Sequence, residues 1–259
     1  MSLYEKFLLF GDSITQDADG QDRGFAWAAA LRGAYVRKLE VLNRGMSGYN
    51  TDQALKVLER VVPNPEYEKL RFMAVFYGAN DACWPTDQNN QSVPIPQYTG
   101  NLIKIFTHPL VKAHNARLII ITPPPVNEYQ TWITDQAKGY TIARRSAEHT
   151  KEYADAAREV GKDLNIPVLD LWRLIMLKAG WKPDDDPLPG SRIAPENPIL
   201  IQMLRDGLHL SPAGYKVLHE GMMELIRRVW PDQVPSRLPN VLPNWNDRDG
   251  WNAFTADEV

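Results

Sequence analysis

The sequence has a single cysteine, no long hydrophobic run and little net charge. With only Cys83, the chain can form neither an intrachain disulfide nor a metal site built from several cysteines. No apolar stretch approaches the roughly 20 residues of a membrane-spanning helix. The apolar run at 7–10 is also shorter than the roughly 7–15 apolar residues of a secretion signal. We therefore expect a cytoplasmic protein with no membrane span.

The near balance of charges argues against polyanionic partners. The chain has 29 basic and 32 acidic residues, for a net charge of −3, so nothing draws it as a whole to nucleic acid or anionic lipid. We expect no nucleic-acid partner, and the sequence leaves homo-oligomerisation open. With 259 residues, of which 44% are hydrophobic, the chain is long enough for one large domain with a sizeable core.

Alternating apolar runs and helical segments predict the fold class. Short runs without polar alternation are typical of buried parallel strands, and they lie at 7–10, 40–43, 72–77, 117–121 and 167–171. Segments with helical spacing lie at about 24–38, 51–60, 97–114 and 135–165, with a last helix after Ser211 and Pro212. This order predicts a three-layer α/β/α sandwich with a central, mainly parallel five-stranded sheet and a ligand site at the carboxyl ends of its strands.

Two proline-rich segments interrupt this pattern. The acidic segment 182–198 is expected to be an exposed loop. Residues 1–230 are expected to form one domain. The extension 231–259, which contains Trp245 and Trp251, is expected to pack on that domain as an irregular strap.

Ser13 is the candidate nucleophile. It stands in Phe10-Gly11-Asp12-Ser13-Ile14-Thr15, directly after the first predicted strand. A tight turn after glycine exposes a serine hydroxyl and nearby N–H groups at the rim of a sheet. Taken alone, Gly-Asp-Ser is equally ordinary turn chemistry.

Two further motifs offer hydrogen-bond donors after the second and third predicted strands. In the segment 43–48, Gly45 and Gly48 can each bring a backbone N–H close to a reacting oxygen. In the segment 77–81, the side-chain amide of Asn80 can donate to an oxyanion. Each segment by itself is also compatible with a simple turn.

The fourth motif supplies a base and a group to orient it. Asp206 precedes His209 by three residues, just before the last predicted helix. In a short turn such an aspartate can accept from Nδ1–H of the imidazole, which leaves Nε2 free to act as a base toward a serine. The rival interpretation is a capping or surface histidine, but Ser211 already suits the cap.

Together the four motifs resemble those of the SGNH hydrolases, also called the GDSL esterase/lipase family. The residues that match the family pattern, in the family's order, are Ser13, Gly48, Asn80 and His209. Segments 4–15 and 78–83 are most similar to members that hydrolyse short acyl esters. The resemblance implies a flavodoxin-like sandwich.

The resemblance also implies an activity and roles for the site residues. The activity would be serine carboxylester hydrolysis of short-chain, acetate-type esters through an acyl-enzyme. Ser13, Asp206 and His209 would be catalytic, while Ser13, Gly48 and Asn80 would form the oxyanion hole. No metal or organic cofactor is implied, and the partner would be a small-molecule ester.

Several alternatives stay open from the sequence. The same site would suit a thioesterase, a carbohydrate acetylesterase or an acyltransferase, and a Cys83–His dyad is a further arrangement. A catalytically silent module that binds a small ligand or a protein is an alternative of another class. Loops at 84–96, 123–132 and 182–205 are expected to wall the pocket, and their apolar content favours an apolar alcohol group.

Overall fold

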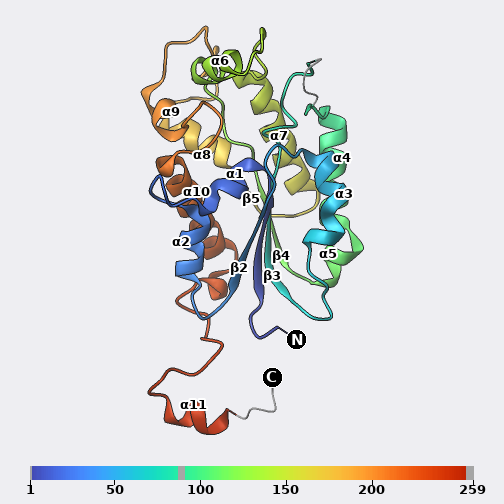
Figure 1. Ribbon diagram of the computed structural model, residues 1–259, viewed down its shortest axis with the longest axis vertical. Coiled ribbons are helices and arrows are strands. Elements are labelled where there is room, and N and C mark those ends of the chain that lie inside the picture. The colour runs from blue at the N-terminus through green and yellow to red at the C-terminus, as the bar shows by residue number, and fades with distance from the viewer. Residues whose placement is uncertain (1, 87–90, 255–259) are drawn as a thin grey trace.

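A parallel sheet forms the centre of the molecule (Figure 1). The structure is a computed structural model that describes residues 2–86 and 91–254. Within these ranges the sheet has five strands in the order β2-β1-β3-β4-β5. The strands are β1 (Lys6–Gly11), β2 (Glu40–Gly45), β3 (Leu70–Phe76), β4 (Arg117–Ile121) and β5 (Val168–Leu169). All neighbouring strands are parallel, which confirms the predicted sandwich.

Helices cover both faces of this sheet. One face is covered by α2 (Trp27–Ala34), α8 (Leu171–Lys178) and α10 (Pro212–Val229). The other is covered by α3 (Thr51–Val61), α4 (Ile95–Thr107), α5 (Pro109–Ala113) and α7 (Ala147–Asp163). Near the carboxyl ends of the strands, at the top of Figure 1, lie α1 (Ser13–Gln16), α6 (Glu128–Ala137) and α9 (Pro198–Met203).

The interior strand β1 shows why the predicted strands lack polar alternation. Successive side chains of a strand point to opposite faces of the sheet. Phe7 and Leu9 pack into the core on the α2, α8 and α10 side, whereas Leu8 and Phe10 pack into the core on the other side. Because both faces are buried, the four consecutive positions 7–10 are all apolar.

The last long helix, α10, begins where the sequence predicts. The side chain of Ser211 accepts from the N–H of Gly214 at 3.2 Å, and Pro212 is the first helical residue. The helix ends at Val229, shortly before Pro231.

Two of the predicted helices are interrupted in the structure. The segment 97–114 is divided into α4 and α5 at His108, because a residue that precedes a proline is disfavoured in the helical region. The prediction of one helix over 135–165 is wrong: α6 ends at Ala137, and α7 begins only after Ser146, whose side chain caps it. Gly139, with φ of +85°, lies in the loop between them, a conformation that favours glycine.

The predicted fifth strand is shorter than expected, and helix α8 replaces its end. The side chain of Asp170 accepts from the N–H of Arg173 at 3.1 Å and caps α8. The strand therefore stops at Leu169.

The segment 182–198 forms no helix or strand up to the start of α9, but it is not wholly exposed as expected. Leu188 and Ser191 are buried, and the N–H of Glu128 donates to the carbonyl of Gly190 at 2.8 Å. A Cβ at Gly190 would lie 2.4 Å from the carbonyl oxygen of Val126. The middle of the loop is thus packed against the chain that leads into α6.

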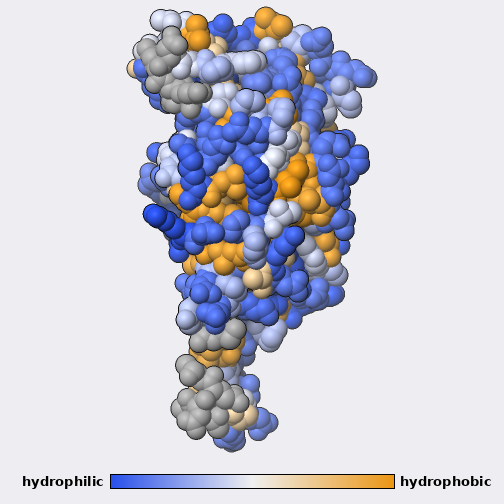
Figure 2. Space-filling model, turned by 90° about the vertical axis from the view of Figure 1, so that its right-hand side faces the viewer, coloured by the Kyte–Doolittle hydropathy of each residue, from blue (hydrophilic) through white to orange (hydrophobic). Residues whose placement is uncertain are grey.

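The chain after α10 divides into a packed part and an exposed part. Val234 and Leu238 pack against the core, and the N–H of Val241 donates to the carbonyl of Arg37 at 2.9 Å. Beyond this point the segment with α11 (Arg248–Ala253) extends below the body (Figure 1, Figure 2). Trp245 is 89% exposed, so this part differs from the packed strap that the composition suggests.

A search of the described ranges for a helix both long and apolar enough to cross a bilayer finds none.

Candidate active site

Ser13 lies just beyond the carboxyl end of strand β1. It is the first residue of α1, and the carboxylate of Asp12 accepts from the N–H of Ile14 at 2.9 Å, which caps this short helix. A Cβ at Gly11 would lie 2.6 Å from the carbonyl oxygen of Phe76. At Gly11 the neighbouring strand β3 therefore lies too close to leave room for a side chain.

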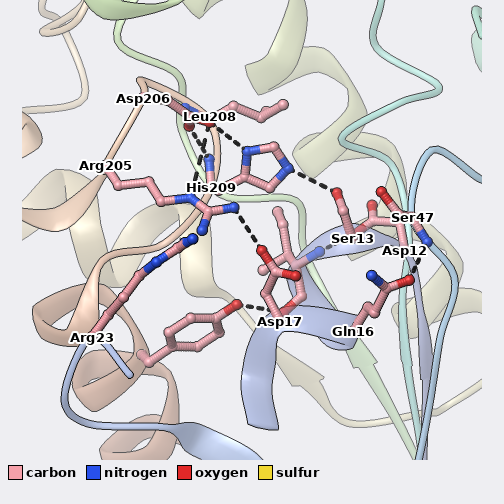
Figure 3. A network of polar contacts seen from close by, with 12 residues as sticks. Asp12, Ser13, Gln16, Asp17, Arg23, Ser47, Arg205, Asp206, Leu208 and His209 are labelled. Carbon is pink, nitrogen blue, oxygen red and sulfur yellow. Dashed lines mark hydrogen bonds and ion pairs between the residues drawn. The ribbon is translucent and has the colours of Figure 1, made fainter. Parts of the chain in front are cut away.

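Three side chains from two segments that lie far apart in the sequence form one hydrogen-bonded series (Figure 3). Ser13 Oγ lies 2.9 Å from His209 Nε2. His209 Nδ1 lies 2.7 Å from Asp206 Oδ2. The distances match those expected for a nucleophile, a base and a group that orients the base.

The environment of Asp206 sets the proton positions in this chain. Burial raises the pKa of Asp206, but hydrogen bonds from the His209 side chain, the charge of that ring and two backbone N–H groups outweigh it and hold the pKa well below its usual range. The ionised carboxylate can only accept, so Nδ1 of His209 carries the hydrogen. In the neutral imidazole, Nε2 is then the acceptor for the Ser13 hydroxyl.

The loop that carries Asp206 and His209 is held from several directions. Gly207 has φ of +83°, and a Cβ there would lie 2.4 Å from the carbonyl oxygen of Asn127. The N–H of Asn127 donates to the Gly207 carbonyl at 2.9 Å. Arg205 donates through Nη2 to Asp17 at 2.6 Å, which ties the loop to the turn that follows α1.

The loops after β2 and β3 leave the sheet on either side of Ser13, because β1 lies between these strands. Of the two glycines in the first loop, Gly45 already donates its N–H to Asn43 Oδ1 at 2.9 Å. Among the described residues the N–H of Gly48 has no acceptor, and Gly48 has φ of +82°. Of the two glycines, Gly48 is therefore the one whose N–H group is available to a substrate oxygen.

Asn80 has a fixed orientation in the loop after β3. Its Oδ1 accepts from Arg145 Nη2 at 3.2 Å, and its Nδ2 donates to the Tyr49 carbonyl at 2.9 Å. An amide nitrogen has two hydrogens, so one remains available for a substrate oxygen.

Two buried carboxyl groups lie beneath the site. Burial raises the pKa of Asp12 to about 7, against the hydrogen bond from Ile14. Burial also raises the pKa of Asp81 to about 6, although Thr51 donates to it from both its N–H and its hydroxyl. Like-charge repulsion adds to both shifts: Asp81 raises the pKa of Asp12, and Asp52 raises the pKa of Asp81.

Among the described residues, the side chain of Cys83 is not hydrogen-bonded to a histidine. Its buried thiol accepts from Arg144 Nη2 at 3.3 Å and lies 4.0 Å from Gln91 Oε1, and no histidine contacts it among the described residues. The described part of the chain also holds no group of three or more histidine, cysteine or carboxylate side chains placed to bind a metal ion.

The residues expected to wall the pocket divide into two sets. One set is buried and anchors its loops in the protein interior; it contains Val93, Val126 and Leu188. Trp84 and Ile193 are 42% and 83% exposed. The loop 84–96 includes residues 87–90, which lie outside the described residues.

Sequence reasoning missed the residues that support the site. Arg144, Arg145 and Gln91 contact the candidate oxyanion donors or their neighbours. Two adjacent arginines in a segment predicted to be helical suggest an exposed helix surface. Gly139 and Ser146 were the available signals for a loop there.

The chain is similar to known proteins over most of its length. The profile of the GDSL-like lipase/acylhydrolase family matches residues 9–217. The isoamyl acetate-hydrolyzing esterase of Saccharomyces cerevisiae is 32% identical, over 97% of this chain and 99% of that protein. The isoamyl acetate-hydrolyzing esterase 1 homolog of Mus musculus is 35% identical, over 95% of this chain and 88% of that protein. Among solved structures, the lipase/acylhydrolase from Enterococcus faecalis has a TM-score of 0.61 at 26% identity, over 91% of this chain and 98% of that one.

Proposed function

The chain belongs to the GDSL-like lipase/acylhydrolase family of ester-bond hydrolases, and from that premise we propose that it cleaves short acetate-type esters with Ser13, His209 and Asp206. The single observation that carries this proposal is the hydrogen-bonded chain from Ser13 Oγ through the imidazole to Asp206. The acetate-type substrate is supported by relatives named for the hydrolysis of isoamyl acetate.

The first step is attack by Ser13 on the ester carbonyl carbon. As the bond from Oγ forms, His209 Nε2, at 2.9 Å, takes the hydroxyl proton. The carboxylate of Asp206 accepts from Nδ1 and stabilises the imidazolium that results.

The negative charge that develops on the carbonyl oxygen is met by three donors. These are the backbone N–H groups of Ser13 and Gly48 and the side-chain amide of Asn80. Removal of one such donor typically lowers turnover by about 10²–10³-fold, because these hydrogen bonds strengthen in the transition state.

The intermediate then collapses in two stages. The alcohol oxygen takes the proton from His209 as its bond to the carbonyl carbon breaks, which leaves an acyl group on Ser13. Water next attacks the acyl carbon while His209 again takes a proton. Return of that proton to Oγ releases the carboxylic acid and regenerates Ser13.

Ser13→Ala tests the nucleophile. We expect hydrolysis of 4-nitrophenyl acetate to fall by at least about 10³-fold, and covalent labelling by a fluorophosphonate, read by intact mass, to disappear. Ser236→Ala, at an exposed position after α10, is the matched control and should keep both properties. Unchanged turnover in Ser13→Ala would remove Ser13 from the mechanism, and absence of labelling in the unmodified protein would favour a silent binding module.

A substrate series tests the substrate class. We expect kcat/KM to be highest for acetate esters of apolar alcohols and to fall steadily through butanoate and octanoate esters. Acetyl thioesters and acetylated xylose, assayed in parallel, separate this function from a thioesterase or a carbohydrate acetylesterase. A higher kcat/KM on either of these would contradict the proposal.

A further inference from the structure

Two adjacent arginines lie in the loop between α6 and α7. Arg144 is 5% exposed and Arg145 is 6% exposed. Guanidinium groups are almost never buried unless they are paired or hydrogen-bonded. Their partners therefore indicate what this loop is for.

The backbone of this loop is fixed at Arg144. Its N–H donates to the buried carboxylate of Asp135 at 3.0 Å, and its carbonyl accepts from the N–H of Trp84 at 2.7 Å. Just beyond the pair, the N–H of Ala147 donates to Glu128 Oε1 at 2.8 Å. The two side chains thus start from a backbone that is held in place.

Arg145 holds the amide of Asn80. Its Nε donates to the carbonyl of Ala79 at 2.9 Å, and its Nη2 donates to Asn80 Oδ1 at 3.2 Å. A guanidinium has no acceptor, so the oxygen of the Asn80 amide must face Arg145. The NH₂ group of that amide then faces the opposite way, toward Tyr49 and the loop of Gly48.

Arg144 reaches the other donor through one intermediate side chain. Its Nη2 donates to Gln91 Oε1 at 2.7 Å, and Gln91 Nε2 donates to the carbonyl of Gly48 at 2.7 Å. On the other side of Gly48, the N–H of Ser47 donates to Gln16 Oε1 at 3.0 Å. The left-handed conformation at Gly48 is held from both sides.

We propose that Arg144 and Arg145 are positioning residues for the oxyanion hole, with Arg145 orienting the amide of Asn80 and Arg144 holding Gly48 through Gln91. Neither touches the substrate. The inference deepens the proposed function and rests on it, because it takes Asn80 and Gly48 as the donors to the oxyanion.

If Arg145 acted only through its charge or through the stability of the fold, its substitution would affect activity differently. The positive charge of Arg145 also lowers the pKa of Asp12, opposing the effect of burial. Loss of that charge would affect the protein whether or not Asn80 is present. A role that acts through Asn80 disappears once the amide is removed.

A double-mutant cycle therefore separates the two roles. With 4-nitrophenyl acetate, we expect Arg145→Met to lower kcat by about 10–100-fold with KM changed by less than about threefold, since a misplaced donor weakens transition-state binding. In the Asn80→Ala background the same substitution should lower kcat by less than about threefold. An equal loss in both backgrounds would overturn the inference. Arg228→Met, at an exposed position on α10, is the matched control.

Arg145→Lys provides a second readout. Lysine keeps the positive charge beside Asp12 but lacks the planar fork that reaches Ala79 and Asn80 together. We expect kcat to stay at least about fivefold below that of the unmodified protein. Full activity in Arg145→Lys would show that charge alone is needed and would overturn the positioning role.

The Arg144 arm is tested in the same way. We expect Arg144→Met and Gln91→Ala to lower kcat by similar factors, and the double variant to lose no more than either alone. A double variant whose loss in kcat equals the product of the two single losses would contradict the proposal that Arg144 acts through Gln91. Circular dichroism and thermal unfolding establish that each variant is folded.

The cycle also distinguishes failure of this inference from failure of the proposed function. If Asn80→Ala keeps full kcat, Asn80 is not an oxyanion donor and the positioning role fails, whereas the proposed function fails if Ser13→Ala keeps full turnover. If Asn80→Ala loses activity while Arg145→Met acts equally in both backgrounds, only the positioning role fails.

Discussion

Asp12 stabilises the start of α1 as a cap, but its burial disfavours the ionised form of its carboxyl group. Its side chain caps α1 and thereby fixes the helix that begins with Ser13. The same carboxyl is 1% exposed, and a buried charge is unfavourable unless it is fully paired. Asn is as good an N-cap as Asp, so the charge itself is not required for the cap.

We expect Asp12→Asn to change how stability depends on pH. Burial raises the pKa of Asp12 from 3.8 to about 7 in the folded state. Between about pH 4 and pH 7 the unfolded chain is therefore ionised at this residue while the folded protein keeps its proton, so the free energy of unfolding falls as pH rises. Asp12→Asn has no group that ionises at this position, so its free energy of unfolding does not fall in this way. Relative to the unmodified protein, the free energy of unfolding of the variant should rise by about 1–4 kcal/mol between about pH 4 and pH 7.

Urea unfolding at pH 4.5, 6.0, 7.5 and 8.5 measures this difference. Asp184→Asn, at an exposed position in the 182–198 segment, controls for the removal of one carboxylate. A stability difference between Asp12→Asn and the unmodified protein that does not grow from pH 4.5 to 7.5 would count against the interpretation.

At the scale of elements, α1 is pressed against the end of β2. A Cβ at Gly45 would lie 1.9 Å from the backbone nitrogen of Gln16 and 2.5 Å from its Cα. The clash is with backbone, which cannot move aside as the end of a side chain can. Gly45 thus serves close packing between α1 and β2, which is a different role from the donor role considered for it.

We expect Gly45→Ala to lower the free energy of unfolding by at least about 2 kcal/mol, because overpacking at a backbone contact forces the elements apart. Because α1 carries Ser13, kcat should fall as well. Gly33→Ala is the matched control: this helical glycine has nothing within 4 Å of the added Cβ, so alanine should raise stability by about 0.5–1 kcal/mol. Thermal unfolding measures both, and a neutral Gly45→Ala would refute the close contact.

At the scale of the whole molecule, the chain after α10 is tied back to the first half of the domain. The hydroxyl of Tyr35 donates to the carbonyl of Gln233 at 3.1 Å, and Arg71 Nη1 donates to Gln233 Oε1 at 2.9 Å. Val234 and Leu238 add apolar contacts with the core. Past Asn244, by contrast, the side chains of the described part are mostly exposed.

Two truncations should therefore differ in stability. Removal of residues 245–259 is expected to change the free energy of unfolding by less than about 0.5 kcal/mol, as for surface positions. Removal of 231–259 should lower it by about 2–4 kcal/mol, because the burial of Val234 and Leu238 is lost. Equal stabilities of the two truncated proteins, measured by urea unfolding, would contradict this division.

The sequence determined the features that depend on local pattern. Parallel strands buried on both faces carry runs of consecutive apolar residues, so β1, β3 and β4 were recognisable from these runs. Ser211 and Pro212 marked the start of α10 by cap chemistry. The four motifs were visible because each stands at the end of a predicted strand or directly before this helix.

The tertiary structure decided what depends on distant partners. Only the fold reveals that the N–H of Gly45 is taken by Asn43, while that of Gly48 has no acceptor among the described residues. Only the fold reveals, too, that Arg145 faces Asn80 across 65 residues of sequence. The loop between α6 and α7 is stabilised by hydrogen bonds of the Arg144 backbone with Asp135 and Trp84. Hydrogen bonds join atoms that are close in space, and the sequence specifies that proximity only through the packing of the whole chain.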